Sequence, residues 1–242
     1  MQQLGHTRSA YCLDHILQTP DTFVRAPLPG MTNVTAIVHV APAAGARFTQ
    51  YTAEFGETGR MAAAAAERFV YVLEGELEIE GHALHADEYA YIPAGSASTI
   101  ESLEPARAAI IEKPYQQLHG AKAPQFFTRR EADVTPVALN GDEWLQVRSL
   151  MPDDPSYDFA VNTMVYQPGA ALSMVEIHVM EHGLLMLEGG GIYRLSDAWY
   201  PVTAGDFIWM GAYCPQWFGA LGKTPTKYLI YKDWNRHPMA GQ

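Results

Sequence analysis

Cysteine is scarce in this chain, which carries only Cys12 and Cys214 among its 242 residues. The two cysteines lie far apart in the sequence and fit no C-x-x-C pattern. The sequence therefore favours neither a disulfide framework nor a zinc site built on thiolates. We expect two buried or partly buried free thiols.

Basic residues are also few. The chain has 16 Lys and Arg residues against 27 Asp and Glu residues, which gives a formal net charge of -11. Such a charge repels polyanions unless a local basic patch overrides it, and the sequence shows no such patch and no helix-turn-helix. We predict that the protein has no nucleic-acid partner.

Long apolar runs are missing as well. No run approaches the roughly 20 residues that span a bilayer, and the N-terminal sequence MQQLGHTRSAYCLDHILQ lacks the apolar core of a signal peptide. We therefore expect a cytoplasmic protein without a membrane partner.

Helical periodicity is scarce, whereas strand-like segments punctuated by Gly and Pro recur along the whole chain. The alanine run at 62–66 is too short for a stable helix and is expected to be loop or strand edge. These observations predict an all-β protein. The expected strands cover residues 34–40, 69–73, 76–80, 88–92, 108–112, 161–166, 174–179, 184–187, 191–195, 206–210 and 228–232.

The two halves of the chain resemble each other. FVYVLEGELEI in the first half aligns with GLLMLEGGGIYRL in the second and places Gly75 over Gly189. Further on, IIEKP aligns with LIYKD and places Lys113 over Lys232. A repeat of this length predicts two β units joined near the polar stretch 121–125. We expect one domain over residues 1–125 and a second over residues 126–242.

A candidate metal site lies in the second unit, where Glu176, His178 and His182 form an E-x-H-x3-H pattern. On a strand, residues i, i+2 and i+6 point to one face, so the three side chains would converge. Gln216 follows after a further Gly-Asp strand. A single histidine is more often structural than a ligand. The combined set of two imidazoles, one carboxylate and one amide nevertheless predicts Mn2+, Fe2+ or Zn2+ with two open coordination positions.

The first unit shows no equivalent ligand set. The repeat places four residues at the ligand positions: Ala62, Ala64, Arg68 and Ser98. The nearby Glu67, His82 and His85 do not reproduce the spacing. We therefore expect the first unit to serve as scaffold and interface without a metal.

The ligand pattern is similar to the two-part signature of the cupin superfamily, G-x5-H-x-H-x3,4-E-x6-G followed by G-x5-P-x-G-x2-H. Gly169 opens the first part. Glu176 stands in place of its first His, His178 matches the second His, and His182 replaces its Glu. Gln216 replaces the His of the second part.

More specifically, EIHVMEHGLLMLEGGGIYRL, WYPVTAGDFIWMGAYCPQWFGALGKTP and KYLIYKDWNR resemble the bicupin (S)-ureidoglycine aminohydrolases of purine catabolism. ARFTQY and RFVYVLEGELE in the first half also resemble that family. The resemblance implies two tandem cupin barrels (double-stranded β-helix, jelly-roll), of which only the C-terminal one is catalytic, and a homo-oligomer. It also implies a metal-dependent enzyme that replaces the amine of (S)-ureidoglycine with water to give (S)-ureidoglycolate and ammonia. Among Mn2+, Fe2+ and Zn2+, the ligand set makes Mn2+ our first choice.

The resemblance assigns further site residues. The family's pattern places Lys232 beside the substrate, where it could pair with the carboxylate or pass a proton to the leaving amine. Tyr193 and Tyr228 would line the pocket. Strand alternation supports this, because Tyr228, Ile230 and Lys232 share one face of their strand.

Two other functions stay open at this level, because a fold alone does not fix the chemistry. The chain could be another cupin enzyme, such as an oxygenase or isomerase acting on a small organic acid. It could also be a bicupin that binds a small molecule without catalysis.

Overall fold

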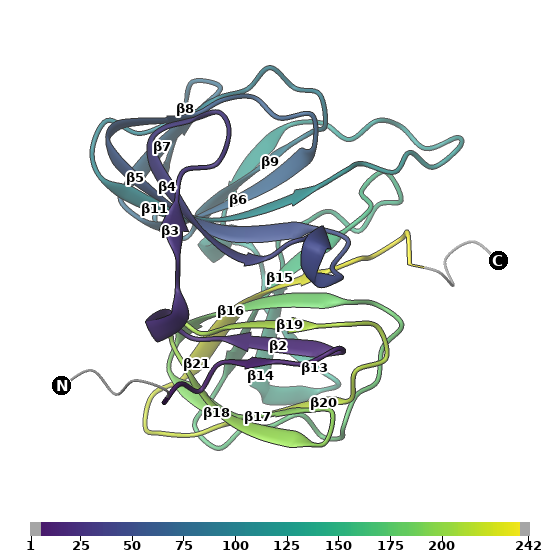
Figure 1. Cartoon of the computed structure of the whole chain (residues 1–242). Helices are drawn as coiled ribbons and strands as arrows, with labels where there is room; N and C mark the ends of the chain where they lie inside the picture. The colour runs from purple at the N-terminus through teal and green to yellow at the C-terminus, as the bar shows by residue number, and fades with distance from the viewer. Residues whose placement is uncertain (1–5, 238–242) are drawn as a thin grey trace. The chain divides into compact units, whose positions relative to one another are not determined.

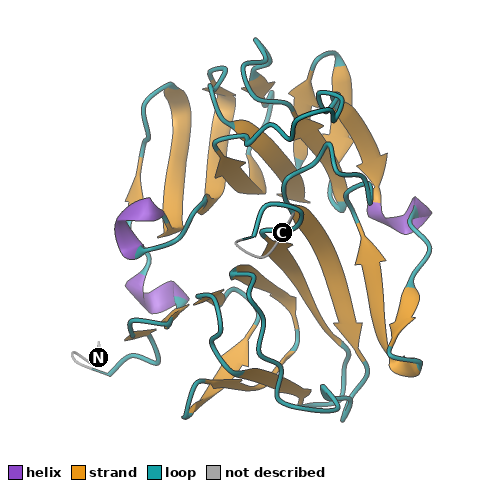
Figure 2. Ribbon diagram, turned by 90° about the vertical axis from the view of Figure 1, so that its right-hand side faces the viewer, coloured by secondary structure: helices purple, strands orange, loops and turns teal. Residues whose placement is uncertain are grey.

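The structure, a computed structural model, describes residues 6–237 and consists almost entirely of β-strands, as expected (Figure 2). Helical structure in the described residues is limited to three short 3-10 turns: η1 (Pro20–Thr22), η2 (Pro42–Ala44) and η3 (Glu131–Asp133). No helix in this part of the chain has the length and apolar character needed to cross a membrane.

The strands form two compact units, divided differently from the expected ranges 1–125 and 126–242. One unit, here called the N-terminal unit, spans residues 24–134. The C-terminal unit combines residues 6–23 with residues 135–237, because β2 (His15–Gln18) pairs antiparallel with β19 (Phe207–Met210). Figure 1 shows purple β2 among the green and yellow strands of this unit. A four-residue strand gives no sign in the sequence of which unit it will join.

The N-terminal unit is one ten-stranded antiparallel sheet, in which β12-β9-β6-β11-β5-β10-β7-β8 follow one another and β4 joins β3 to β5. Its strands are β3 (Arg25–Ala26), β4 (Met31–Val40), β5 (Thr49–Met61), β6 (Glu67–Glu74), β7 (Glu76–Ile79), β8 (His82–His85), β9 (Glu88–Ile92), β10 (Ile100–Glu101), β11 (Ala106–Lys113) and β12 (Phe127–Arg130).

The C-terminal unit has an eight-stranded sheet, β1-β2-β19-β16-β21-β15-β14-β13, and a three-stranded sheet, β18-β17-β20. Besides β2 and β19, its strands are β1 (Ala10–Tyr11), β13 (Val137–Leu139), β14 (Asp142–Ser149), β15 (Ala160–Tyr166), β16 (His182–Glu188), β17 (Gly190–Leu195), β18 (Ala198–Thr203), β20 (Gln216–Ala220) and β21 (Thr226–Lys232).

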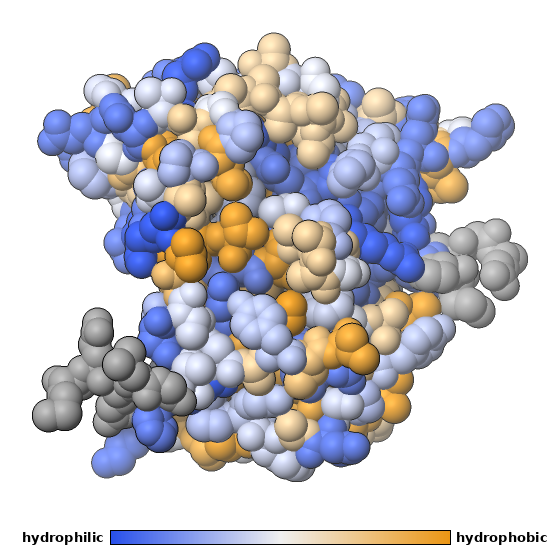
Figure 3. Space-filling model, in the orientation of Figure 1, coloured by the Kyte–Doolittle hydropathy of each residue, from blue (hydrophilic) through white to orange (hydrophobic). Residues whose placement is uncertain are grey.

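Each unit has its own apolar core, built from alternate residues of its strands. In β21, Tyr228 and Ile230 belong to the core of the C-terminal unit, whereas Leu229 and Tyr231 point to the other face of the sheet. The expected alternation of this strand is therefore confirmed, and it directs Lys232 to the core side. Some apolar residues also reach the surface, where Figure 3 shows them interspersed with hydrophilic ones, as is normal for globular proteins.

The internal repeat is visible at two equivalent glycines. Gly75 follows β6 and Gly189 follows β16, and both have positive φ angles, 76° and 66°. A Cβ atom at Gly75 would lie 2.6 Å from the Pro105 carbonyl oxygen, and one at Gly189 would lie 2.7 Å from the Pro225 carbonyl oxygen. Only glycine satisfies both the backbone angle and the close approach.

Strand pairing corrects one detail of the repeat. In the C-terminal unit, Lys232 of β21 pairs with His182 of β16. The corresponding pair in the N-terminal unit is Glu112 of β11 with Arg68 of β6. Glu112, and not Lys113, is thus the counterpart of Lys232. A shift of one residue turns a side chain to the opposite face of its sheet.

The segment before β1 is held to the C-terminal unit by an ion pair. The Arg8 guanidinium donates to both carboxylate oxygens of Asp206, at 2.6 and 2.9 Å, and the Asp206 side chain is fully buried. Arg8→Met is expected to lower the free energy of unfolding by about 1.5–3 kcal/mol, because it leaves this buried carboxylate without its charged partner. Urea denaturation measures the change.

A matched control is Arg60→Met, which removes the exposed ion pair between Arg60 and Glu101. Its effect on the free energy of unfolding should be much smaller, because both partners stay hydrated when separated. Equal losses in the two variants would contradict the stabilising role of the Arg8–Asp206 pair.

Candidate active site

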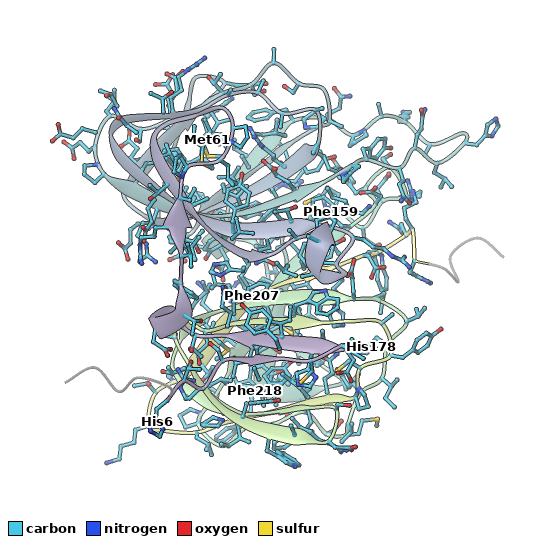
Figure 4. All side chains as sticks on the ribbon, in the orientation of Figure 1. His6, Met61, Phe159, His178, Phe207 and Phe218 are labelled. Atoms are coloured by element: carbon cyan, nitrogen blue, oxygen red, sulfur yellow. The ribbon has the colours of Figure 1, made fainter. Side chains whose placement is uncertain are left out.

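A cavity of about 210 Å³ in the C-terminal unit brings together every residue that the sequence marked as functional. Figure 4 labels His178 in this unit. The residues lining the cavity are Leu139, Met164, Leu172, Glu176, His178, Met180, His182, Tyr193, Gln216, Tyr228, Ile230, Lys232 and Trp234.

His182 is the most deeply buried of the expected ligands, with 3% of its surface exposed at the start of β16. Its Nδ1 lies 3.3 Å from the Tyr231 carbonyl oxygen. A carbonyl only accepts, so Nδ1 carries the proton and Nε2 keeps a free lone pair. Burial lowers the pKa of His182 to about 3, with smaller contributions from Lys232 and His178. The imidazole is therefore neutral, the form that binds metals.

Glu176 and His178 do not lie on a strand, and the strand expected over residues 174–179 is wrong. The segment is a loop that makes one isolated bridge, in which the Glu176 N–H donates to the Gln216 carbonyl at 2.8 Å and the Gln216 N–H donates back at 2.9 Å. The side chains still meet, since His178 Nε2 lies 3.1 Å from Glu176 Oε2. The ring centroids of His178 and His182 are 5.3 Å apart.

Gln216 begins β20 and is 4% exposed. The Tyr193 hydroxyl donates to its Oε1 at 3.4 Å. Its backbone bridge to Glu176 holds the two residues opposite each other although they are far apart in the sequence. The amide oxygen of Gln216 therefore belongs to the same group of polar atoms as the Glu176 carboxylate.

Lys232 ends β21 and places an ammonium group in the cavity. When the Asn162 side-chain amide is oriented so that its nitrogen and its oxygen both form hydrogen bonds, the oxygen accepts one from Lys232 Nζ at 2.9 Å. Burial lowers the pKa of Lys232, and the charge of Glu176 opposes this shift. A cation is thus fixed in a largely apolar wall by one amide and one nearby carboxylate.

The two expected tyrosines also lie in the cavity wall. Tyr193 and Tyr228 are almost fully buried, and the Tyr228 hydroxyl lies 2.8 Å from that of Tyr166. Burial raises the pKa of all three tyrosines well above the usual value. Their hydroxyl groups therefore stay protonated and can both donate and accept hydrogen bonds.

The donor set of the cavity fits a divalent metal. His182 offers a buried lone pair with no protein partner on that nitrogen in the described contacts, and Glu176, His178 and Gln216 add one carboxylate oxygen, one imidazole nitrogen and one amide oxygen. Such mixed nitrogen and oxygen donors suit first-row metals such as Mn2+, Fe2+ and Zn2+.

Sequence reasoning missed two polar residues of this site. Asn162 supports Lys232, and Tyr166 contacts Tyr228. Both lie on β15, which the sequence predicted as a strand. Asn162, Met164 and Tyr166 are two residues apart along β15 and therefore lie on one face of this strand. Only the pairing of β15 with β21 shows that this face meets the cavity.

The equivalent place in the N-terminal unit holds an ion pair. Arg68, the counterpart of His182, donates from Nε to Glu112 at 2.6 Å, and the Tyr51 hydroxyl donates to the same oxygen at 2.8 Å. These side chains line a cavity of about 250 Å³. A guanidinium is a donor only and cannot ligate a metal. A larger hollow of about 770 Å³ along β8 and β12 contains none of the expected site residues.

Comparison with known proteins gives close relatives, although no protein-family model matches the chain. The chain is 42% identical to "Probable (S)-ureidoglycine aminohydrolase" of Oryza sativa subsp. japonica, covering 97% of this chain and 78% of that protein. It is 40% identical to (S)-ureidoglycine aminohydrolase of Arabidopsis thaliana, covering 97% of this chain and 80% of that protein.

Solved structures identify the architecture. The chain matches the crystal structure of protein Ylba from Escherichia coli with a TM-score of 0.84 and 28% identity, over 95% of each chain. It matches oxalate decarboxylase of Bacillus subtilis, a protein with Mn(II) centres, with a TM-score of 0.69 and 10% identity. That match covers 94% of this chain and 79% of the other and shows the fold alone. The expected cupin fold is thereby confirmed.

Proposed function

The chain belongs to the (S)-ureidoglycine aminohydrolase family, and from this premise we propose that its C-terminal cavity hydrolyses (S)-ureidoglycine to (S)-ureidoglycolate and ammonia. The observation that carries the proposal is the convergence of Glu176, His178, His182, Gln216 and Lys232 on one small cavity. The proposed reaction is a step of purine catabolism that breaks a C–N bond.

We propose Mn2+ as the bound metal, with Glu176, His178, His182 and Gln216 as its protein ligands. Two of the four donors are oxygens and none is sulfur. This composition favours Mn2+ or Fe2+ over metal ions that prefer thiolate ligands. When bound, the metal would act as a Lewis acid and orient the substrate through its carboxylate and amine.

The other polar residues of the cavity position the substrate. Lys232 Nζ, held by Asn162, donates to the substrate carboxylate and lies in the same small cavity as the leaving amine, to which it can pass a proton. The hydroxyls of Tyr193 and Tyr228 supply hydrogen bonds from the wall. Water adds its oxygen to the carbon, the C–N bond breaks, and the nitrogen leaves as ammonia.

Ammonia release tests the proposed function directly. Metal-loaded protein and freshly prepared (S)-ureidoglycine should give ammonia and (S)-ureidoglycolate in equal amounts, above the spontaneous decay of the substrate. Oxygen consumption or an isomer of an organic acid would instead indicate a different cupin enzyme. Substrate binding without turnover would indicate a binding protein.

The role of Gln216 gives a separate prediction. Gln216→His exchanges an amide oxygen for an imidazole nitrogen, and the variant should keep a bound metal while its preference moves from Mn2+ toward Zn2+. Competition between the two ions, read by elemental analysis, measures the shift. An unchanged preference would place Gln216 outside the metal's ligands.

A further inference from the structure

The chain's only two cysteines, from opposite ends of the sequence, lie at one place in the C-terminal unit. Asp14, His15 and Cys214 bring their ligand atoms within 4.8 Å of one another, and no other trio of His, Cys, Asp or Glu among residues 6–237 does so. Cys12 lies against the Tyr200 hydroxyl, which in turn bonds His15. None of these residues lines the cavity of the candidate active site.

We propose that Asp14, His15 and Cys214 form a second metal site of this protein and that it takes Zn2+. A thiolate, an imidazole and a carboxylate are the donors that zinc prefers, and sulfur distinguishes this trio from the oxygen-rich set of the cavity. His15 and Cys214 are 3% and 4% exposed, whereas the Asp14 side chain is 41% exposed and leaves an entry path from solvent.

The hydrogen bonds of His15 suit a metal ligand. Its Nδ1 lies 2.8 Å from Asp14 Oδ1 and its Nε2 lies 2.9 Å from the Tyr200 hydroxyl. Without metal, Nδ1 donates to the carboxylate and Nε2 accepts from Tyr200. Zinc bound by Nδ1 and Oδ1 would need these atoms to move a few tenths of an ångström further apart than 2.8 Å, because two zinc bonds of about 2.0 Å span more than that in tetrahedral geometry. The imidazole proton would then be carried by Nε2 and donated to the Tyr200 oxygen, the outer hydrogen bond that metal-bound histidines typically make. The thiol of Cys214 releases one proton to solvent on binding.

The trio would join two segments of the C-terminal unit, and water would take the fourth position of a tetrahedral zinc because only three protein ligands converge. Asp14 ends the turn between β1 and β2, His15 begins β2, and the Asp14 carbonyl accepts from the Gly211 N–H at 2.8 Å. Cys214 lies in the loop 211–215 between β19 and β20, and Gln216 is the first residue of β20. Zinc would therefore join the N-terminal segment to the loop that leads to Gln216. The proposal does not depend on the chemistry assigned to the cavity.

Cobalt substitution tests the site, because Co2+ bound to a thiolate shows a sulfur-to-metal charge-transfer band in the near ultraviolet. The full-length protein, stripped with a chelator and titrated with Co2+, should develop this band. Cys214→Ser should abolish the band. His15→Gln should weaken the affinity of the site for Co2+ about tenfold or more, read from the Co2+ concentration at which the band develops. Circular dichroism checks that both variants fold.

Two controls separate this site from its surroundings. His182→Ala removes a proposed ligand of the cavity, whose lining includes no cysteine, and should leave the band intact. Cys12→Ser should also retain it, since Cys12 is not one of the three converging residues. The proposal is overturned if the unsubstituted protein shows no band at saturating Co2+, if the band survives both Cys214→Ser and His15→Gln unchanged, or if Cys12→Ser alone removes it.

Discussion

His182→Ala is expected to lose both the bound metal and ureidoglycine hydrolysis while the protein stays folded. His182 is the most deeply buried of the proposed ligands and its Nε2 lone pair faces no protein partner among the described contacts, so we expect no other described residue of the cavity to replace it. Loss of a Lewis acid that contributes several kcal/mol to the transition state lowers kcat at least about a hundredfold. Elemental analysis of the purified variant and the ammonia assay give the two readouts.

A matched control for this variant lies in the other unit. His39 is 4% exposed, bonds Thr52 Oγ1 through Nε2 at 2.9 Å, and has its pKa lowered to about 3 by burial, much as His182 does. His39→Ala removes a buried neutral imidazole of the same kind, so it should cost stability yet leave metal content and turnover unchanged. If both variants lose activity in proportion to their loss of stability, His182 is a structural residue.

The all-β class and the main strands could be predicted because alternating apolar residues bury one face of a strand. Gly75 and Gly189 revealed the repeat because no other residue fits a positive φ beside a carbonyl. Short strands such as β2 were not predictable, since four residues carry too little pattern. The 13-residue β5 was also missed, because polar residues interrupt its alternation.

The candidate site was found by residue type and spacing, although the geometry argued for it was partly wrong. E-x-H-x3-H predicted that three side chains meet, and they do line one cavity, but Glu176 and His178 reach it from a loop that bridges to Gln216. That bridge depends on the pairing of distant segments. The same limit hid Asn162, whose contact with Lys232 exists only once β15 pairs with β21.

Lys232→Met should fold and bind metal yet turn over (S)-ureidoglycine at least about tenfold less efficiently. Removing one charge-assisted hydrogen bond costs about 1.5–3 kcal/mol, which corresponds to roughly 10- to 150-fold in kcat/KM. The stability of the variant should change little, because methionine keeps the apolar stem and removes a cation whose burial is costly. A structural lysine would give the opposite pattern, lost stability with normal turnover.

Kinetic parameters and a control on the same strand distinguish the roles of this ammonium group. A rise in KM for Lys232→Met indicates pairing with the substrate carboxylate, whereas a fall in kcat alone indicates proton transfer to the leaving amine.

Lys113 is not a suitable control, since strand pairing makes Glu112 the counterpart of Lys232. Lys227 is suitable, because it lies on β21 but on the face opposite Tyr228, Ile230 and Lys232. Lys227→Met removes the same charge from the same strand and should leave kcat/KM nearly unchanged. Equal losses in the two variants would show that the charge of the strand, and not the position of Lys232 in the cavity, governs turnover.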